Sequence, residues 1–306
     1  MSQRCPLCNV ETSSVVYKNV PQFPECDIVQ CLNCSHRYTV VHKTIDVDKL
    51  YVDEVYKVVE NRDSIFDKII RREYNGVLYQ LDQFKTQKGN LLDFGTGKGQ
   101  FGNLAKKDGW KVKAVETSPD RAAYAREIYG LDVNTNFYSA GSIFNINFEA
   151  LTLFHVLEHL PQPGILLKQL VTDNVRADGM VIVEVPNISS WQSGIAKENW
   201  IHLDVPRHIN HFSPEILKKF LTDLHFIPVK TSYFSFHLGV LGMVDSLLKK
   251  FGYKKNIIFE LKNNKSKVLI AAIGLILPFA LVMEFFASRF GKGGIIRVYL
   301  FKKEIS

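Results

Sequence analysis

The residues best suited to bind a ligand lie in the stretch Asp93-Phe-Gly-Thr-Gly-Lys-Gly99, in which three glycines alternate with other residues. A short apolar run, 90–92, precedes this stretch, and a helix-like segment, 101–107, follows it. Glycine is needed where a tight turn between strand and helix visits positive φ, and where the backbone must approach a ligand without an intervening Cβ. The pattern therefore predicts a binding site for a nucleotide-like ligand at the N-terminus of that helix.

Two ligand classes fit these glycines. Gly97-x-Gly99-x-x-Gly102 fits the dinucleotide pattern, whereas the alternation that begins at Asp93 is typical of S-adenosylmethionine sites. A carboxylate directly before the turn would repel a pyrophosphate, but it can hold the α-ammonium of S-adenosylmethionine, directly or through water. Glu116 ends the next predicted strand, where an acid can accept both ribose hydroxyls of either ligand. The methyl donor is favoured. An NAD-dependent sugar-modifying enzyme and a non-catalytic binding module are the alternatives.

A second group of reactive residues lies near the N-terminus, as Cys5-x-x-Cys8 and Cys31-x-x-Cys34. Two such pairs 22 residues apart are typical of a zinc ribbon, in which four thiolates close a tetrahedron around a structural ion. The segment 1–42 has too little apolar content for a core of its own, so zinc would supply much of its folding free energy. Cys26 is left over, and a closed four-thiolate site has no open position for catalysis.

Length and composition limit what else the chain can do. Its 306 residues are 46% hydrophobic, enough for one full core and a small accessory unit. The net charge is +7, but lysines and arginines are scattered, so no nucleic-acid stripe is predicted, and an anionic substrate or a membrane surface suits the charge. Residues 1–5 contain no apolar core, so we expect no signal peptide and a reducing cytoplasm, where free or metal-bound cysteines are the norm.

These groups must be positioned by regular elements. A charged, helix-like lead-in covers 43–88, and from residue 89 strands alternate with helices, which predicts a mostly parallel sheet covered on both faces. Strands are predicted at Leu91–Phe94, Val112–Glu116, near Val133, Ala150–His155, Met180–Pro186, Phe226–Phe234 and Ile295–Phe301, and helices at Phe101–Lys107, Pro119–Tyr129, Gly164–Val175 and from Ser213 to Leu224.

The late part of the chain contains an insertion, 240–290, with an uncharged run at 268–283 that Gly274 and Pro278 interrupt. A 16-residue helix spans about 24 Å, less than the roughly 30 Å of a bilayer core. Basic residues flank the run. A buried or lid-forming helix is favoured over an interfacial helix, and a membrane span is the least favoured of the three.

Four segments together resemble class I S-adenosylmethionine-dependent methyltransferases, which have a Rossmann-like fold with a mostly parallel seven-stranded sheet and an antiparallel last strand. They are Asp93–Gly99, Glu116, Phe154-His-Val-Leu-Glu-His159 and Leu203-Asp-Val-Pro-Arg-His208. With the N-terminal cysteines they are most similar to the zinc-binding subgroup found in bacterial sugar and polysaccharide modification. The resemblance implies a sugar-nucleotide or lipid-linked glycan acceptor. A lipid-linked acceptor would suit peripheral membrane contact through the apolar run 268–283 beside its lysines, whereas a soluble acceptor, which is slightly favoured, would suit a lid. The resemblance also implies these cofactor contacts: Asp93, Gly95, Thr96, Gly97, Gly99, Glu116, Thr117, Ser118, Ala140, Gly141 and His155.

Histidines are the candidate catalytic residues. Methyl transfer from a sulfonium is an in-line displacement, so alignment contributes much of the rate, and a hydroxyl acceptor also needs a base. His155 and His159 follow the fourth predicted strand at the edge where open α/β sheets bind ligands, and His208 and His211 come from the polar segment 199–214. Arg207 either binds an anionic group of the acceptor or pairs with Asp204.

Overall fold

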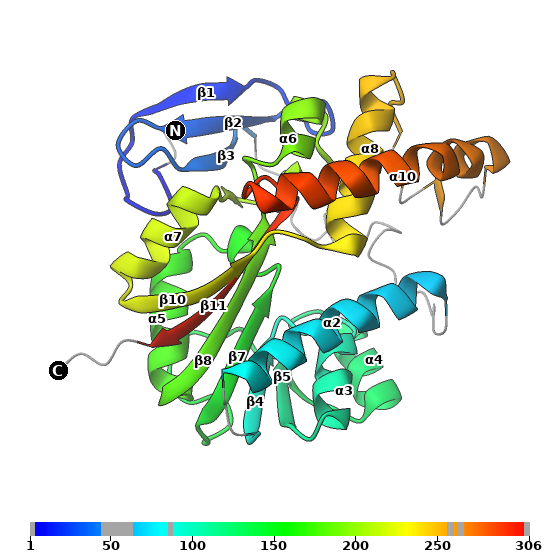
Figure 1. Ribbon diagram of the computed structural model, residues 1–306. Helices are drawn as coiled ribbons and strands as arrows, with labels where there is room; N and C mark the ends of the chain where they lie inside the picture. The colour runs from blue at the N-terminus through cyan, green and yellow to red at the C-terminus, as the bar shows by residue number, and fades with distance from the viewer. Residues whose placement is uncertain are drawn as a thin grey trace.

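The computed structural model describes residues 4–43, 64–84, 88–255, 257, 260–261 and 266–302. Two sheets organise the chain (Figure 1). The larger has seven strands in the order β10 (Phe226–Ser232), β11 (Ile295–Lys302), β8 (Val175–Pro186), β7 (Phe148–Phe154), β4 (Asn90–Phe94), β5 (Lys111–Val115) and β6 (Asp132–Asn134). Strands β8, β7, β4, β5 and β6 pair in parallel, whereas β11 is antiparallel to both β8 and β10. The predicted fold class is confirmed.

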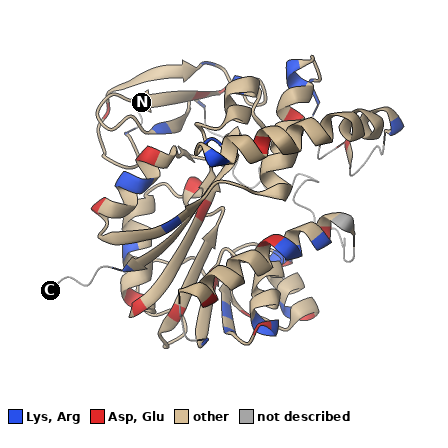
Figure 2. Cartoon of the chain, viewed as in Figure 1, with Lys and Arg blue, Asp and Glu red and all other residues tan. Residues whose placement is uncertain are grey.

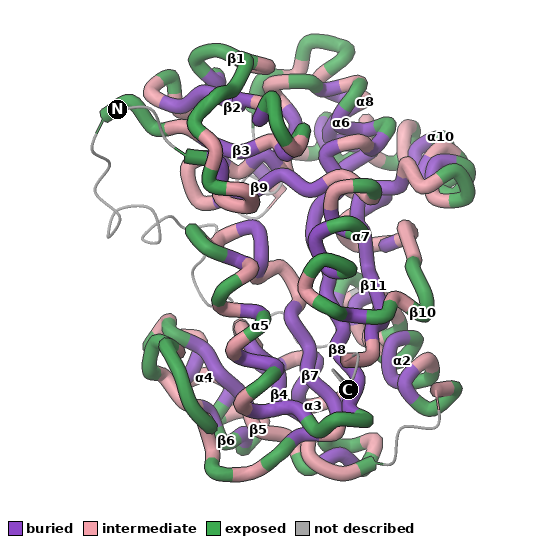
Figure 3. Tube along the Cα trace, turned by 90° about the vertical axis from the view of Figure 1, so that its left-hand side faces the viewer, coloured by how far each residue is buried: buried purple, intermediate pink, exposed green. Residues whose placement is uncertain are grey.

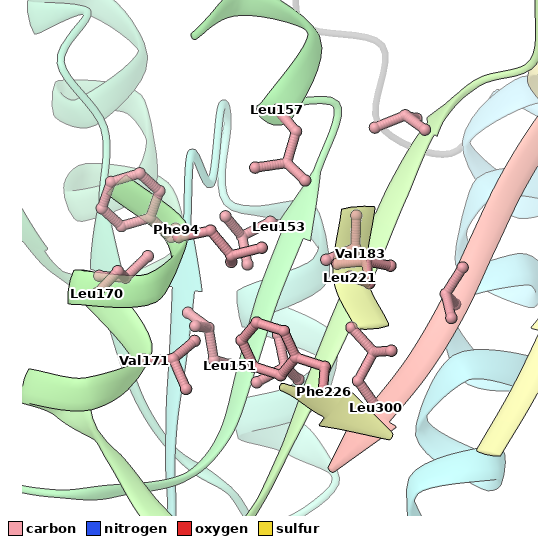
Figure 4. Close-up of a cluster of buried hydrophobic side chains, with 14 of the residues drawn as sticks. Phe94, Leu151, Leu153, Leu157, Leu170, Val171, Val183, Leu221, Phe226 and Leu300 are labelled. Carbon is pink, nitrogen blue, oxygen red and sulfur yellow. The ribbon is translucent and has the colours of Figure 1, made fainter. Parts of the chain in front are cut away.

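The sheet is covered on both faces because neighbouring residues of each strand point to opposite sides. Leu92, Leu151 and Val183 pack with helices α5 (Pro163–Asn174) and α7 (Pro214–Asp223). The close-up shows Leu151 and Val183 among the side chains of this cluster (Figure 4). The adjacent strand residues Leu91 and Ala150 pack on the other side with α2 (Ile65–Gln83) and α3 (Gln100–Lys107). Strands β7, β8 and β11 are consequently buried along most of their length (Figure 3).

The predicted elements from residue 89 onward are present, with ends moved by a few residues. Helix α4 (Pro119–Tyr129) has the predicted bounds and ends at Gly130, whose φ of 58° is the left-handed cap that glycine favours. Strand β8 begins at Val175, earlier than predicted, and β10 ends at Ser232, two residues before the predicted end. Of the lead-in 43–88, α2 is helical as expected, while residues 44–63 lie outside the described part of the chain.

The N-terminal cysteine segment forms a second, antiparallel sheet of β1 (Ser13–Tyr17), β2 (Cys26–Cys31) and β3 (Arg37–Val41). A fourth strand, β9 (Asn210–His211), joins this sheet from the distant polar segment, with Arg37 opposite His211 and Tyr38 opposite Asn210. The ribbon, as we call residues 4–43, is therefore docked on the large domain by backbone hydrogen bonds.

The apolar run lies in α10 (Lys267–Arg289), which packs along α8 (Leu241–Lys250) and the short helix η4 (Phe236–Val240). The helix passes through Pro278 without interruption. Proline lacks the N–H that would bond residue 274, and its ring crowds that carbonyl, but the glycine there leaves the backbone room to adjust. Only 17% of its most apolar window is buried, so α10 is not a buried helix, while the lid-forming alternative that was favoured together with it stays a prediction. By length and composition α10 could cross a membrane.

Candidate active site

The glycine turn follows β4 and leads into α3. Gly95, Gly97 and Gly99 all have positive φ, at 78°, 57° and 79°, as the sequence pattern predicts. A Cβ placed on Gly97 would meet no atom within 4 Å, so this side of the turn is open. A ligand can therefore approach the backbone at Gly97 closely.

Asp93 lies beneath the turn and is almost completely buried. Its Oδ2 accepts a hydrogen bond from the Thr96 hydroxyl at 2.5 Å, and its Oδ1 accepts one from Thr152 at 2.8 Å. Burial raises the pKa of Asp93 to about 6, against the lowering effect of these two hydrogen bonds. Asp93 and Thr96 thus hold the turn in shape, and a direct contact of Asp93 with the ligand stays a prediction.

Glu116 stands directly after β5 and faces the turn. Its Oε2 accepts the backbone N–H of Gly97 and its Oε1 accepts that of Ser118, both at 2.8 Å. Each carboxylate oxygen has a second lone pair, so Glu116 can also accept the two hydroxyls of a ribose. Ser118 is the N-cap of α4 but acts through its N–H, and Thr117 is exposed beside it.

A hollow of about 180 Å³ lies next to Glu116, at the ends of β5 and β6. Ala140 lines it as predicted, whereas Gly141 donates its N–H to Asp173 at 2.7 Å. Asn134 and Asn136 also line it and were missed by the sequence analysis. Their signal was weak, because the strand that ends at Asn134 has only three residues.

His155 follows β7 with a φ of 56° and lies between two buried carboxylates. Its Nε2 is 2.9 Å from Glu184 and its Nδ1 is 3.2 Å from Glu158. Burial lowers the pKa of His155, but the hydrogen bonds and charges of Glu158 and Glu184 outweigh it and raise the pKa to about 10. A protonated imidazole has no lone pair to accept a proton, so the geometry gives His155 a structural role.

We therefore expect His155→Gln to lower the free energy of unfolding by about 3 kcal/mol, because it breaks buried ion pairs and leaves Glu158 without its partner. Urea unfolding measures this directly. His225→Gln is the matched control, since His225 also has positive φ, 65°, but is exposed. Equal losses in the two variants would show that backbone strain, not charge pairing, explains the effect.

His159 and His208 meet at the same edge of the sheet. Their ring centroids are 4.7 Å apart and their planes are inclined by 73°. Burial and, to a lesser extent, the nearby His208 together lower the pKa of His159 to about 4, so His159 is neutral at pH 7. Arg207 is paired with Asp204 through two hydrogen bonds, which is the second of the two roles considered for it.

This edge adjoins the glycine turn. Val156, between His155 and η1 (Leu157–His159), lies so close to Gly95 that a Cβ on that glycine would approach its Cγ2 to 2.6 Å. The predicted cofactor turn and the predicted catalytic histidines are therefore neighbours in space. The sequence placed four histidines on two candidate rim segments, and the structure brings three of them together here, His155, His159 and His208.

The ribbon fixes this edge through buried polar contacts. The Thr39 hydroxyl donates to the His208 carbonyl at 2.7 Å and contacts Nε2 of His211 at 2.9 Å. Asn210 accepts from His36 Nε2 at 3.0 Å and donates to the carbonyls of Leu157 and Leu160. His211 is fully engaged in the interior and is not a candidate base.

The four predicted metal ligands converge at the end of the ribbon. One Sγ from each of Cys5, Cys8, Cys31 and Cys34 lies within 4.8 Å of the others, with Cys5 to Cys34 at 3.6 Å and Cys8 to Cys31 at 3.5 Å. Backbone N–H groups of Leu7, Cys8, Val10 and His36 point at these sulfurs, as in zinc knuckles. This donor set fits a structural zinc ion. Cys26 packs in the apolar core beside Val20 and Ile28, away from the cluster.

Residues 66–230, more than half of the chain, match a protein family described as a methyltransferase domain. With the sheet order and the glycine turn, this match defines a class I S-adenosylmethionine-dependent methyltransferase. The chain belongs to the methyltransferase domain family, and the sequence prediction of the enzyme class and its methyl donor is confirmed. The residues around Gly97 and Glu116 fit that donor.

Solved methyltransferase structures are similar to this chain at low sequence identity. The plantazolicin methyltransferase BpumL, bound to SAH, is 17% identical with a TM-score of 0.50, covering 85% of this chain and 91% of its own. A SAM-dependent methyltransferase from Archaeoglobus fulgidus is 20% identical with a TM-score of 0.49, covering 77% of this chain and 97% of its own. Comparison with curated proteins gave no match.

Proposed function

We propose that this methyltransferase transfers the methyl group to a hydroxyl of a sugar that is carried on a nucleotide or on a lipid phosphate. The observation that carries the proposal is the pair His159 and His208 beside the glycine turn, because a hydroxyl acceptor must lose its proton during attack. The resemblance of the sequence to sugar-modifying methyltransferases supports the acceptor class. So does the net charge of +7, which suits an anionic carrier.

The residues of the site have separate roles in binding and catalysis. S-adenosylmethionine supplies an electrophilic methyl group. Gly97 and Glu116 hold its nucleoside, and the hollow lined by Asn134 and Asn136 receives the base. His159 and His208 act on the proton of the acceptor, while His155 and Glu184 keep the edge of the sheet rigid. The cysteine cluster binds zinc and holds the ribbon against β9.

Helix α10 supplies the contact with the carrier. Its outer face exposes Leu275, Phe279 and Phe286, and basic residues stand at both ends of the helix while its length is almost uncharged (Figure 2). An apolar face between lysines and arginines suits an anionic lipid surface. Because α10 also packs along α8, the geometry favours a helix that lies in the interface over one that spans it. The enzyme would then act at the cytoplasmic face of a membrane.

A direct assay tests the acceptor class. The purified enzyme is incubated with methyl-labelled S-adenosylmethionine and three acceptor sets: nucleotide-linked sugars, polyprenyl-phosphate-linked glycans in vesicles, and free sugars. We expect transfer to one of the phosphate-linked sets and at least tenfold less to free sugars. Equal transfer to free sugars would show that the enzyme does not recognise the phosphate-linked carrier. Transfer to none of the three sets, with intact cofactor binding, would refute the sugar acceptor.

A further inference from the structure

Outside the ribbon, the described residues contain one more cluster of metal-type ligands: Glu158, His159 and His208. One ligand atom from each lies within 4.8 Å of the others. Two imidazoles and one carboxylate form the donor set of many first-row divalent cation sites that keep open coordination positions. Glu158 is completely buried, and His155 pairs with only one of its two carboxylate oxygens.

The two histidines already have their tautomers set. His159 Nδ1 donates to the carbonyl of Arg207 at 3.0 Å, and His208 Nδ1 donates to the carbonyl of His202 at 2.9 Å. Because Nδ1 carries the hydrogen in both rings, Nε2 is the nitrogen left to coordinate an ion in each. A backbone carbonyl on the remote nitrogen is how metal-binding histidines are usually oriented.

Glu158 supplies an independent indication. Its Oε1 is 3.2 Å from His155 Nδ1, but its Oε2 is buried and has no hydrogen-bond partner among the described residues. A buried carboxylate oxygen without a hydrogen-bond partner is rare in folded proteins, and binding of an ion is one way to satisfy it. Asp204 adds a further carboxylate, 3.7 Å from His208 Nε2, although Arg207 offsets its charge.

We propose that Glu158, His159 and His208 bind a divalent cation of the Zn²⁺, Co²⁺ or Mn²⁺ type. Donor atoms around tetrahedral zinc lie about 3.4 Å apart, so the three donors need only a modest approach from their present separation. The site is distinct from the cysteine ribbon, which offers only sulfur ligands.

The role of this ion, unlike its binding, rests on the proposed function. Val156 places the cluster beside the glycine turn, so an acceptor hydroxyl bound to the ion would face the methyl donor. With Nε2 bound to the ion, His159 and His208 would act on the proton of the acceptor through the ion and not as bases. The ion would lower the pKa of that hydroxyl, and its proton would pass to water. The oxygen then forms its bond to the methyl carbon as the carbon–sulfur bond breaks, and the electron pair of that bond returns to sulfur.

Cobalt titration tests binding without any activity assay. The full chain, with zinc in the ribbon, is titrated with Co²⁺ and followed by visible absorption. We expect one equivalent to bind with d–d bands but without the intense thiolate charge-transfer band of a cysteine site. His159→Gln and His208→Gln should each weaken this binding at least tenfold, whereas His225→Gln, the exposed control, should leave it unchanged.

The Co²⁺ titration of the wild type tests the proposed cation site even if a variant fails to fold. Absence of saturable, thiolate-free Co²⁺ binding to the wild type would overturn the site. Unchanged binding in folded His159→Gln and His208→Gln would overturn the assignment of ligands. Saturable Co²⁺ binding that these variants lose, with no methyl transfer to any acceptor, would support the site while refuting the proposed function.

Discussion

Glu116→Gln is expected to weaken S-adenosylmethionine binding at least tenfold, or about 1.4 kcal/mol. Both oxygens of Glu116 accept backbone N–H groups, from Gly97 and Ser118, while facing the expected ribose. An amide keeps one of these acceptors and turns an NH₂ group against the other N–H. The substitution therefore removes an acceptor for the ribose and disturbs the glycine turn. Titration calorimetry measures the affinity.

Glu127→Gln is the control for this prediction. Glu127 lies on the exposed side of α4, so the variant makes the same chemical change a short distance away without touching the turn. We expect its affinity to equal that of the wild type. If Glu116→Gln also bound with unchanged affinity, the nucleoside would have to lie elsewhere.

A double substitution, Leu275→Glu/Phe279→Glu, is expected to abolish flotation of the enzyme with anionic vesicles at low salt. The two side chains are 74% and 67% exposed and lie one turn apart on the outer face of α10. Two carboxylates there remove apolar area from the lipid contact and are repelled by anionic head groups. The core face of the helix stays intact, so the fold should be retained.

Ile165→Glu serves as the control, because Ile165 is comparably exposed, at 63%, but lies on α5. This variant should float like the wild type, and high salt should weaken flotation of both by screening the flanking lysines. Failure of the wild type to float at low salt would refute the membrane contact. If the wild type instead formed dimers that the double variant lost, the face would be an interface between two copies.

Much of this structure was predictable because it depends on residues that are close together in the sequence. The glycine turn, the helix from Pro119 and the last strand each depend on a few consecutive residues, and all were predicted close to their observed bounds. The cysteine cluster was predictable for the same reason, since ligand spacing within each pair is fixed by the knuckle turn.

Other features depend on partners far away in sequence. From the sequence alone, His155 is a candidate general base. Only the pairing of β7 with β8 brings Glu184 within 2.9 Å of its ring, where the carboxylate becomes its partner. The two-residue strand β9 has no periodicity to detect, although it docks the ribbon. Hydrophobicity alone also could not show that one side of α10 faces outward, because both sides of the helix are apolar.

The side chain of Asn210 has a wider consequence. It joins His36 of the ribbon, two residues after Cys34, to the carbonyls on either side of Glu158 and His159. Zinc bound to the cysteines would order this junction, and so would an acceptor or an ion bound at the edge of the large sheet. Binding at each place then favours binding at the other by the same factor, as thermodynamic reciprocity requires.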